Sequence, residues 1–217
     1  MRVAVRPTDD VGRRAVHVLL ADRTVEAVGL LGTQPSHTAG GRLQPVDSAE
    51  GWDVLVLDAD PNGEETTIPV IGSTKPELWL LAALASTVGR EQAATVSAWT
   101  EPGSPLTAGT RVRFPDPVGP LLAVPAERPE RALVGDYMRA PGAEEPWIGL
   151  SVTGNGGGLI DRVAVVEHAD FLRGVTLAAA AMATVQTGGW KAPGFWRALI
   201  EIARRRGLVM AAPSRHT

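Results

Sequence analysis

The spacing of apolar residues at the start of the chain predicts a strand, a helix and a second strand. Valines alternate with other residues over 2–6, and β-branched side chains favour strands. The polar turn that follows contains Thr8 and Asp9, either of which can cap a helix. Apolar residues then recur at helical spacing over 11–21, and 24–31 forms a second strand. This order favours a parallel sheet with right-handed crossovers.

The next segments continue the alternation of connections, strands and helices. Gly32–Gly51 is rich in Gly, Pro, Ser and Thr, which predicts a mobile surface connection. Trp52–Ala59 is apolar except near its ends, as expected of a strand buried on both faces. Ile68–Gly72 is a shorter strand of the same kind. Pro76–Val88 is a predicted helix, with proline in its first turn.

The pattern of residues changes after residue 92, where prolines and short β-like runs replace the alternation of strands and helices. Residues 147–166 predict a hairpin, because glycines in its centre supply the positive φ angles of a tight reversal. Two helices close the chain, over about 171–186 and 193–206. The second ends in arginines followed by glycine, a typical helix end.

These patterns predict an α/β protein with two domains. Residues 1–92 form a Rossmann-like domain built on a parallel sheet. Residues 93–217 form a mixed α/β domain that contains a second sheet and the C-terminal helices.

The composition excludes several classes of function. Of 217 residues, 44% are hydrophobic, and the net charge of −3 argues against a broad nucleic-acid-binding surface. The absence of cysteine excludes disulfides, thiolate metal sites and a cysteine nucleophile, and fits a reducing compartment. The charged start differs from a secretory signal, and no apolar run approaches the roughly 20 residues that span a bilayer. We therefore expect a cytoplasmic protein that binds neither membranes nor nucleic acid.

The turn after the first strand is where a dinucleotide-binding protein holds its pyrophosphate, using a G-x-G-x-x-G motif. With Gly12 as the third glycine, Pro7 and Asp9 occupy the first two positions. Their side chains crowd a phosphate. Asp9 and Asp10 also oppose its charge by a few kcal/mol, at about 5 Å and an effective dielectric near 20. The alternative interpretation is that both aspartates simply cap the helix and complement its dipole.

The candidate cofactor is NAD(P), although the second strand ends without the acid that usually holds the ribose. Its candidate contacts lie in the turn and after the buried strand: Arg6, Thr8, Gly12, Arg13 and Asp58. Asp58 and Asp60 can bind a cation or a ribose, or can belong to an ordinary turn.

Two residues are candidate catalytic groups. Lys75 follows a predicted strand, where a lysine can donate a proton or contact an anion; the alternative is a solvated helix-start lysine. His168 lies between Glu167 and Asp170, which makes it the best acid or base, although Asp170 is also a natural helix cap. No histidine–carboxylate spacing marks a metal site.

Four stretches together resemble the saccharopine dehydrogenase/reductase-like oxidoreductases. They are RVAVRPTDDVGRRAVHVLL, RVRFPDPVGPLLAVP, IGLSVTGNGGGLIDRVAVV and TVQTGGWKAPGFWRALIEIARRRGL. The resemblance implies an N-terminal dinucleotide-binding domain and a C-terminal mixed α/β domain whose final helices pack back onto the first. At the residue level it extends only to the turn Arg6–Arg13, and it identifies no catalytic residue.

Two functional hypotheses follow. The first is an NAD(P)-dependent oxidoreductase that acts on a small polar metabolite. The second is a non-redox descendant of the same fold, whose nucleotide site is closed by Pro7, Asp9 and Asp10 and which acts as a binding or partner protein. A homodimer formed through the C-terminal sheet is compatible with either.

Overall fold

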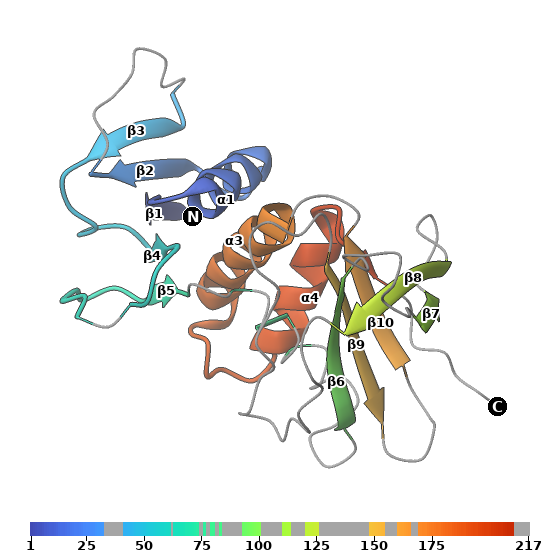
Figure 1. Cartoon of the computed structure of the whole chain (residues 1–217). Coiled ribbons are helices and arrows are strands. Elements are labelled where there is room, and N and C mark those ends of the chain that lie inside the picture. Colours follow the sequence, from blue (N-terminus) through green and yellow to red (C-terminus); the bar gives the residue numbers. More distant parts are fainter. Residues whose placement is uncertain are drawn as a thin grey trace. The chain divides into compact units, whose positions relative to one another are not determined.

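The computed structural model divides by internal packing into two compact units (Figure 1). One comprises Met1–Pro76 with Arg173–Arg206, and the other comprises Glu77–Leu172 with Gly207–Thr217. The structure describes residues 1–32, 41–61, 63–73, 76, 79–80, 83, 93–100, 110–113, 120–125, 148–154, 160–165 and 169–210. Because residues 77–92 lie almost entirely outside this set, the predicted boundary at residue 92 stays a prediction.

The first unit contains a five-stranded parallel sheet, which confirms the predicted Rossmann-like α/β fold. Its order is β3-β2-β1-β4-β5. The strands are β1 (Arg2–Arg6), β2 (Ala27–Leu31), β3 (Leu43–Val46), β4 (Val54–Leu57) and β5 (Val70–Gly72). Chain progression reverses between β1 and β4, the switch point at which ligands bind in open α/β sheets.

Among the described residues, three helices belong to this unit wholly or for most of their length: α1 (Asp10–Ala21), α3 (Ala169–Thr187) and α4 (Phe195–Arg205). The Ala-rich α3 is buried throughout 172–183. Its Gly174 lies so close to α1 that an added Cβ would meet the Cβ of Arg14 at 2.5 Å. This contact confirms the expectation that the final helices pack back onto the first sheet-and-helix unit.

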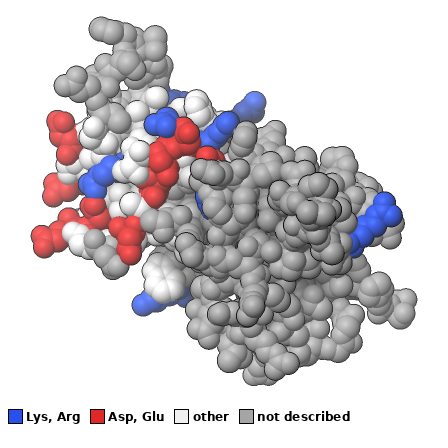
Figure 2. All heavy atoms as spheres, viewed as in Figure 1, with Lys and Arg blue, Asp and Glu red and all other residues white. Residues whose placement is uncertain are grey.

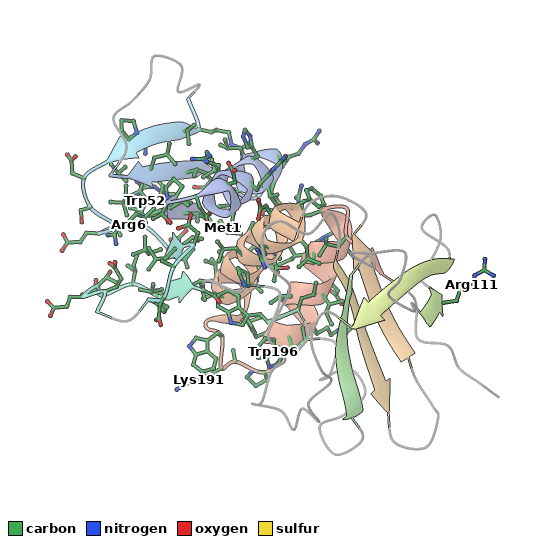
Figure 3. All side chains as sticks on the ribbon, viewed as in Figure 1. Met1, Arg6, Trp52, Arg111, Lys191 and Trp196 are labelled. Atoms are coloured by element: carbon green, nitrogen blue, oxygen red, sulfur yellow. The ribbon has the colours of Figure 1, made fainter. Side chains whose placement is uncertain are left out.

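Around Trp52, the β3–β4 connection covers the core of this sheet. Buried residues of three strands form one cluster with Ala49 and Trp52 of the β3–β4 connection. The Trp52 ring lies over Gly29, where an added Cβ would meet it at 2.6 Å. The guanidinium of Arg2 lies 4.6 Å from the centre of the ring of Trp52, the residue labelled in Figure 3.

The second unit is built on an antiparallel sheet of order β11-β10-β9-β6-β8-β7. Its strands are β6 (Ala93–Thr100), β7 (Thr110–Arg113), β8 (Pro120–Pro125), β9 (Ile148–Gly154), β10 (Ile160–Val165) and β11 (Val209–Met210). Ile160 pairs with Thr153 in antiparallel register. The predicted hairpin over 147–166 is therefore confirmed in its two strands.

One strand corrects the sequence analysis. β3 lies inside Gly32–Gly51, which the composition predicts to be a mobile surface connection. It forms the edge of the sheet and contains Pro45, a residue that edge strands tolerate because one side of their backbone needs no partner. Of the predicted helix Pro76–Val88, most residues lie outside the described set.

Candidate functional site

The carboxylate of Asp58 lies at the switch point and binds the turn between β1 and α1. Asp58 directly follows β4, and its Oδ2 accepts hydrogen bonds from the backbone N–H groups of Thr8 at 2.6 Å and Asp9 at 2.9 Å. Its Oδ1 accepts a third bond from the Thr8 hydroxyl at 2.6 Å. Only 6% of Asp58 is exposed. A buried carboxylate therefore occupies two amides of the turn that would otherwise point toward an anionic ligand.

Gly12 makes room for this carboxylate. A Cβ added at Gly12 would lie 2.3 Å from Asp58 Oδ2 and 2.7 Å from the Cα of Pro7. Side chains essentially never approach this closely, so Asp58 can take its present position only because residue 12 is a glycine. Gly12, the one glycine of the G-x-G-x-x-G pattern present here, thus lets a carboxylate of the protein itself approach the turn.

The side chain of Asp9 accepts hydrogen bonds from the next two free N–H groups of the turn, at the start of α1. Its Oδ1 accepts hydrogen bonds from the N–H groups of Val11 at 2.8 Å and Gly12 at 3.2 Å, which makes it the N-cap of α1. The interpretation of Asp9 as a helix cap is thus confirmed. Together, Asp9 and Asp58 accept from four backbone N–H groups of one short turn.

The two carboxyl groups have displaced pKa values of opposite sign. Burial raises the pKa of Asp9 above the ordinary 3.8, and its hydrogen bond and charge interaction with Asp58 raise it further, against the lowering effect of the Gly12 and Val11 amides. Burial also acts to raise the pKa of Asp58, but hydrogen bonds from Thr8 and Asp9 outweigh it and hold that pKa below 3.8. Asp58 is therefore the member of the pair that stays ionised to lower pH.

The two arginines predicted to contact a cofactor have acidic partners. Arg6 forms an ion pair with Glu64 of the β4–β5 connection. Arg13 forms one with Asp10 at 2.6 Å, on the surface of α1. Of the predicted contacts, the structure thus brings Thr8, Gly12 and Asp58 together, while Arg6 and Arg13 bind carboxylates of their own.

The candidate catalytic residues Lys75 and His168 lie outside the described residues. Within the described part of the chain, no three His, Asp or Glu side chains gather in a way that could hold a metal ion. In the same part, no helix combines the length and the apolar character needed to cross a bilayer.

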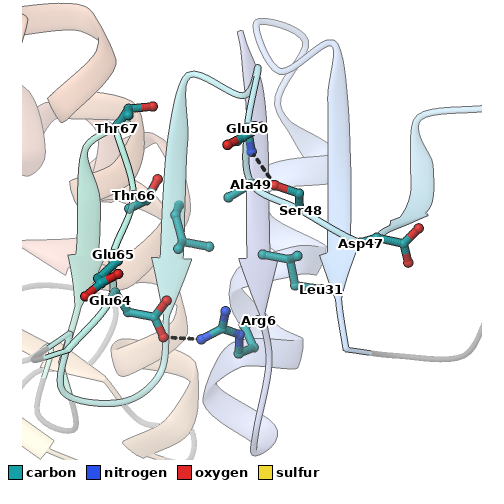
Figure 4. Close-up of a pocket in the computed structure, with 11 residues that line it drawn as sticks. Arg6, Leu31, Asp47, Ser48, Ala49, Glu50, Glu64, Glu65, Thr66 and Thr67 are labelled. Atoms are coloured by element: carbon teal, nitrogen blue, oxygen red, sulfur yellow. Dashed lines mark hydrogen bonds and ion pairs between the residues drawn. The ribbon is translucent and has the colours of Figure 1, made fainter.

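A second feature of the first unit is a groove of about 620 Å³ over the sheet. Its lining includes buried Leu31, Leu55 and Ala49, and the Arg6–Glu64 ion pair lies at one end (Figure 4). The remaining lining residues come from the β3–β4 and β4–β5 connections: Asp47, Ser48, Glu50, Glu65, Thr66 and Thr67. The sequence analysis missed this groove, because most of its lining residues lie in two connections whose composition is typical of turns.

The strand order and the β1–α1 turn define the class of fold, an open parallel α/β sheet of the Rossmann-like type. Among solved structures, the chain is similar to a dihydrodipicolinate reductase from Paenisporosarcina sp. TG-14, described as bound to dipicolinate. The two are 15% identical, with a TM-score of 0.38 over 85% of this chain and 94% of that one. No family model and no curated protein sequence matches the chain. The resemblance to saccharopine dehydrogenase-like proteins stays a prediction.

Proposed function

We propose that this chain is a non-redox descendant of the dinucleotide-binding α/β proteins and acts as a binding or partner protein. The observation that carries the proposal is the position of Asp58, whose carboxylate accepts hydrogen bonds from the backbone N–H groups of Thr8 and Asp9 in the turn. In a dinucleotide-binding protein, the amides of this turn and the positive end of the helix hold the pyrophosphate. Here a side chain of the protein supplies the anion.

A pyrophosphate entering this turn would have to displace Asp58 or bind beside it. Displacement takes three hydrogen bonds from the Asp58 carboxylate, and the new bonds from the turn to the phosphate only offset that loss. Binding beside it sets like charges against one another, at roughly 3 kcal/mol per pair of unit charges 5 Å apart and an effective dielectric of 20. Both routes therefore disfavour binding of a pyrophosphate in this turn.

The second candidate is an NAD(P)-dependent oxidoreductase that acts on a small polar metabolite. The strand order favours it, because the turn lies at the switch point where such cofactors bind. In that case the cofactor would supply the hydride, and Lys75 and His168 would be the residues to examine for proton transfer. This candidate requires Asp58 to leave the turn.

Titration calorimetry with NADPH and with NADH separates the two candidates. We expect no heat of binding from the wild-type chain at millimolar nucleotide. The variant Asp9→Gly/Asp10→Ala restores a glycine and removes two charges, but we expect no binding there either, because Asp58 still occupies the turn. Saturable binding to the wild-type chain, or a clear gain of NADPH affinity in the variant, would contradict the proposal and favour the oxidoreductase.

A further inference from the structure

We draw no further inference here: the strongest candidate, the groove over the first sheet in the part of the first unit where acidic side chains gather (Figure 2), is bordered by exposed carboxylates above packed core residues, and nothing in the described part of the chain shows what binds there.

Discussion

Replacing Asp58 by alanine should destabilise the first unit strongly, because it leaves the β1–α1 turn without its acceptor. The change removes hydrogen bonds from Thr8 N–H, Thr8 Oγ1 and Asp9 N–H, all between 2.6 and 2.9 Å long. Bonds to a charged group contribute about 1.5–3 kcal/mol each, but water can reach this exposed turn and replace part of the loss. We therefore expect the free energy of unfolding to fall by about 3 kcal/mol. Asp58→Asn keeps one acceptor oxygen and should cost roughly half as much.

Urea unfolding followed by circular dichroism measures this loss, with linear extrapolation to water. Asp47→Ala is the control, because it removes an exposed carboxylate and should change the free energy by less than about 0.5 kcal/mol. A double-mutant cycle with Thr8→Val isolates the hydroxyl–carboxylate bond and should give a coupling of about 1 kcal/mol. A loss below 0.5 kcal/mol for Asp58→Ala would refute the reasoning, because the turn would then hold its shape without the carboxylate.

Two further predictions concern the same turn. The folded-state pKa of Asp58 lies below 3.8, so its contribution to stability is complete at about pH 5 and is lost as the pH falls through that folded pKa. The pKa of Asp9 is raised, so its contribution to stability decreases as the pH rises above 3.8. The stability difference between wild type and Asp58→Asn should therefore stay constant above about pH 5 and shrink in more acidic urea titrations, and a difference that grows toward low pH would contradict this sign. Gly12→Ala should lower the free energy of unfolding by about 2 kcal/mol, because its Cβ meets Asp58 Oδ2 and the Pro7 backbone, whereas Gly41→Ala meets nothing within 4 Å and should be nearly neutral. Equal effects of the two glycine substitutions in thermal melts would contradict the close approach.

Local patterns were enough to predict most of the first unit. Alternating valines predict β1, the polar turn and helical spacing predict α1, and a continuous apolar run predicts β4. β3 escapes prediction because an exposed edge strand needs neither an alternating pattern nor an uninterrupted set of amide donors, so Pro45 is tolerated there. Edge strands are specified by the neighbour with which they pair, and this information does not lie in their own residues.

The candidate site shows the same division between local and long-range information. The cap formed by Asp9 spans three residues and can be predicted from the turn alone. The bond from Thr8 to Asp58 joins positions 50 residues apart, and the Arg6–Glu64 pair joins positions 58 apart. Sequence reasoning placed both Thr8 and Asp58 near a cofactor, because both lie at strand ends of the switch point. Only the fold shows that they bind each other.

The most direct test of the central claim follows the amide signals of the turn during a titration with inorganic pyrophosphate. In a ¹H–¹⁵N correlation spectrum, the N–H groups of Thr8, Asp9, Val11 and Gly12 report whether their acceptors change. If Asp58 and Asp9 already occupy these donors, the four signals stay in place up to millimolar pyrophosphate at neutral pH. Saturable movement of all four signals would contradict the account, because it would show that the turn still receives an external phosphate.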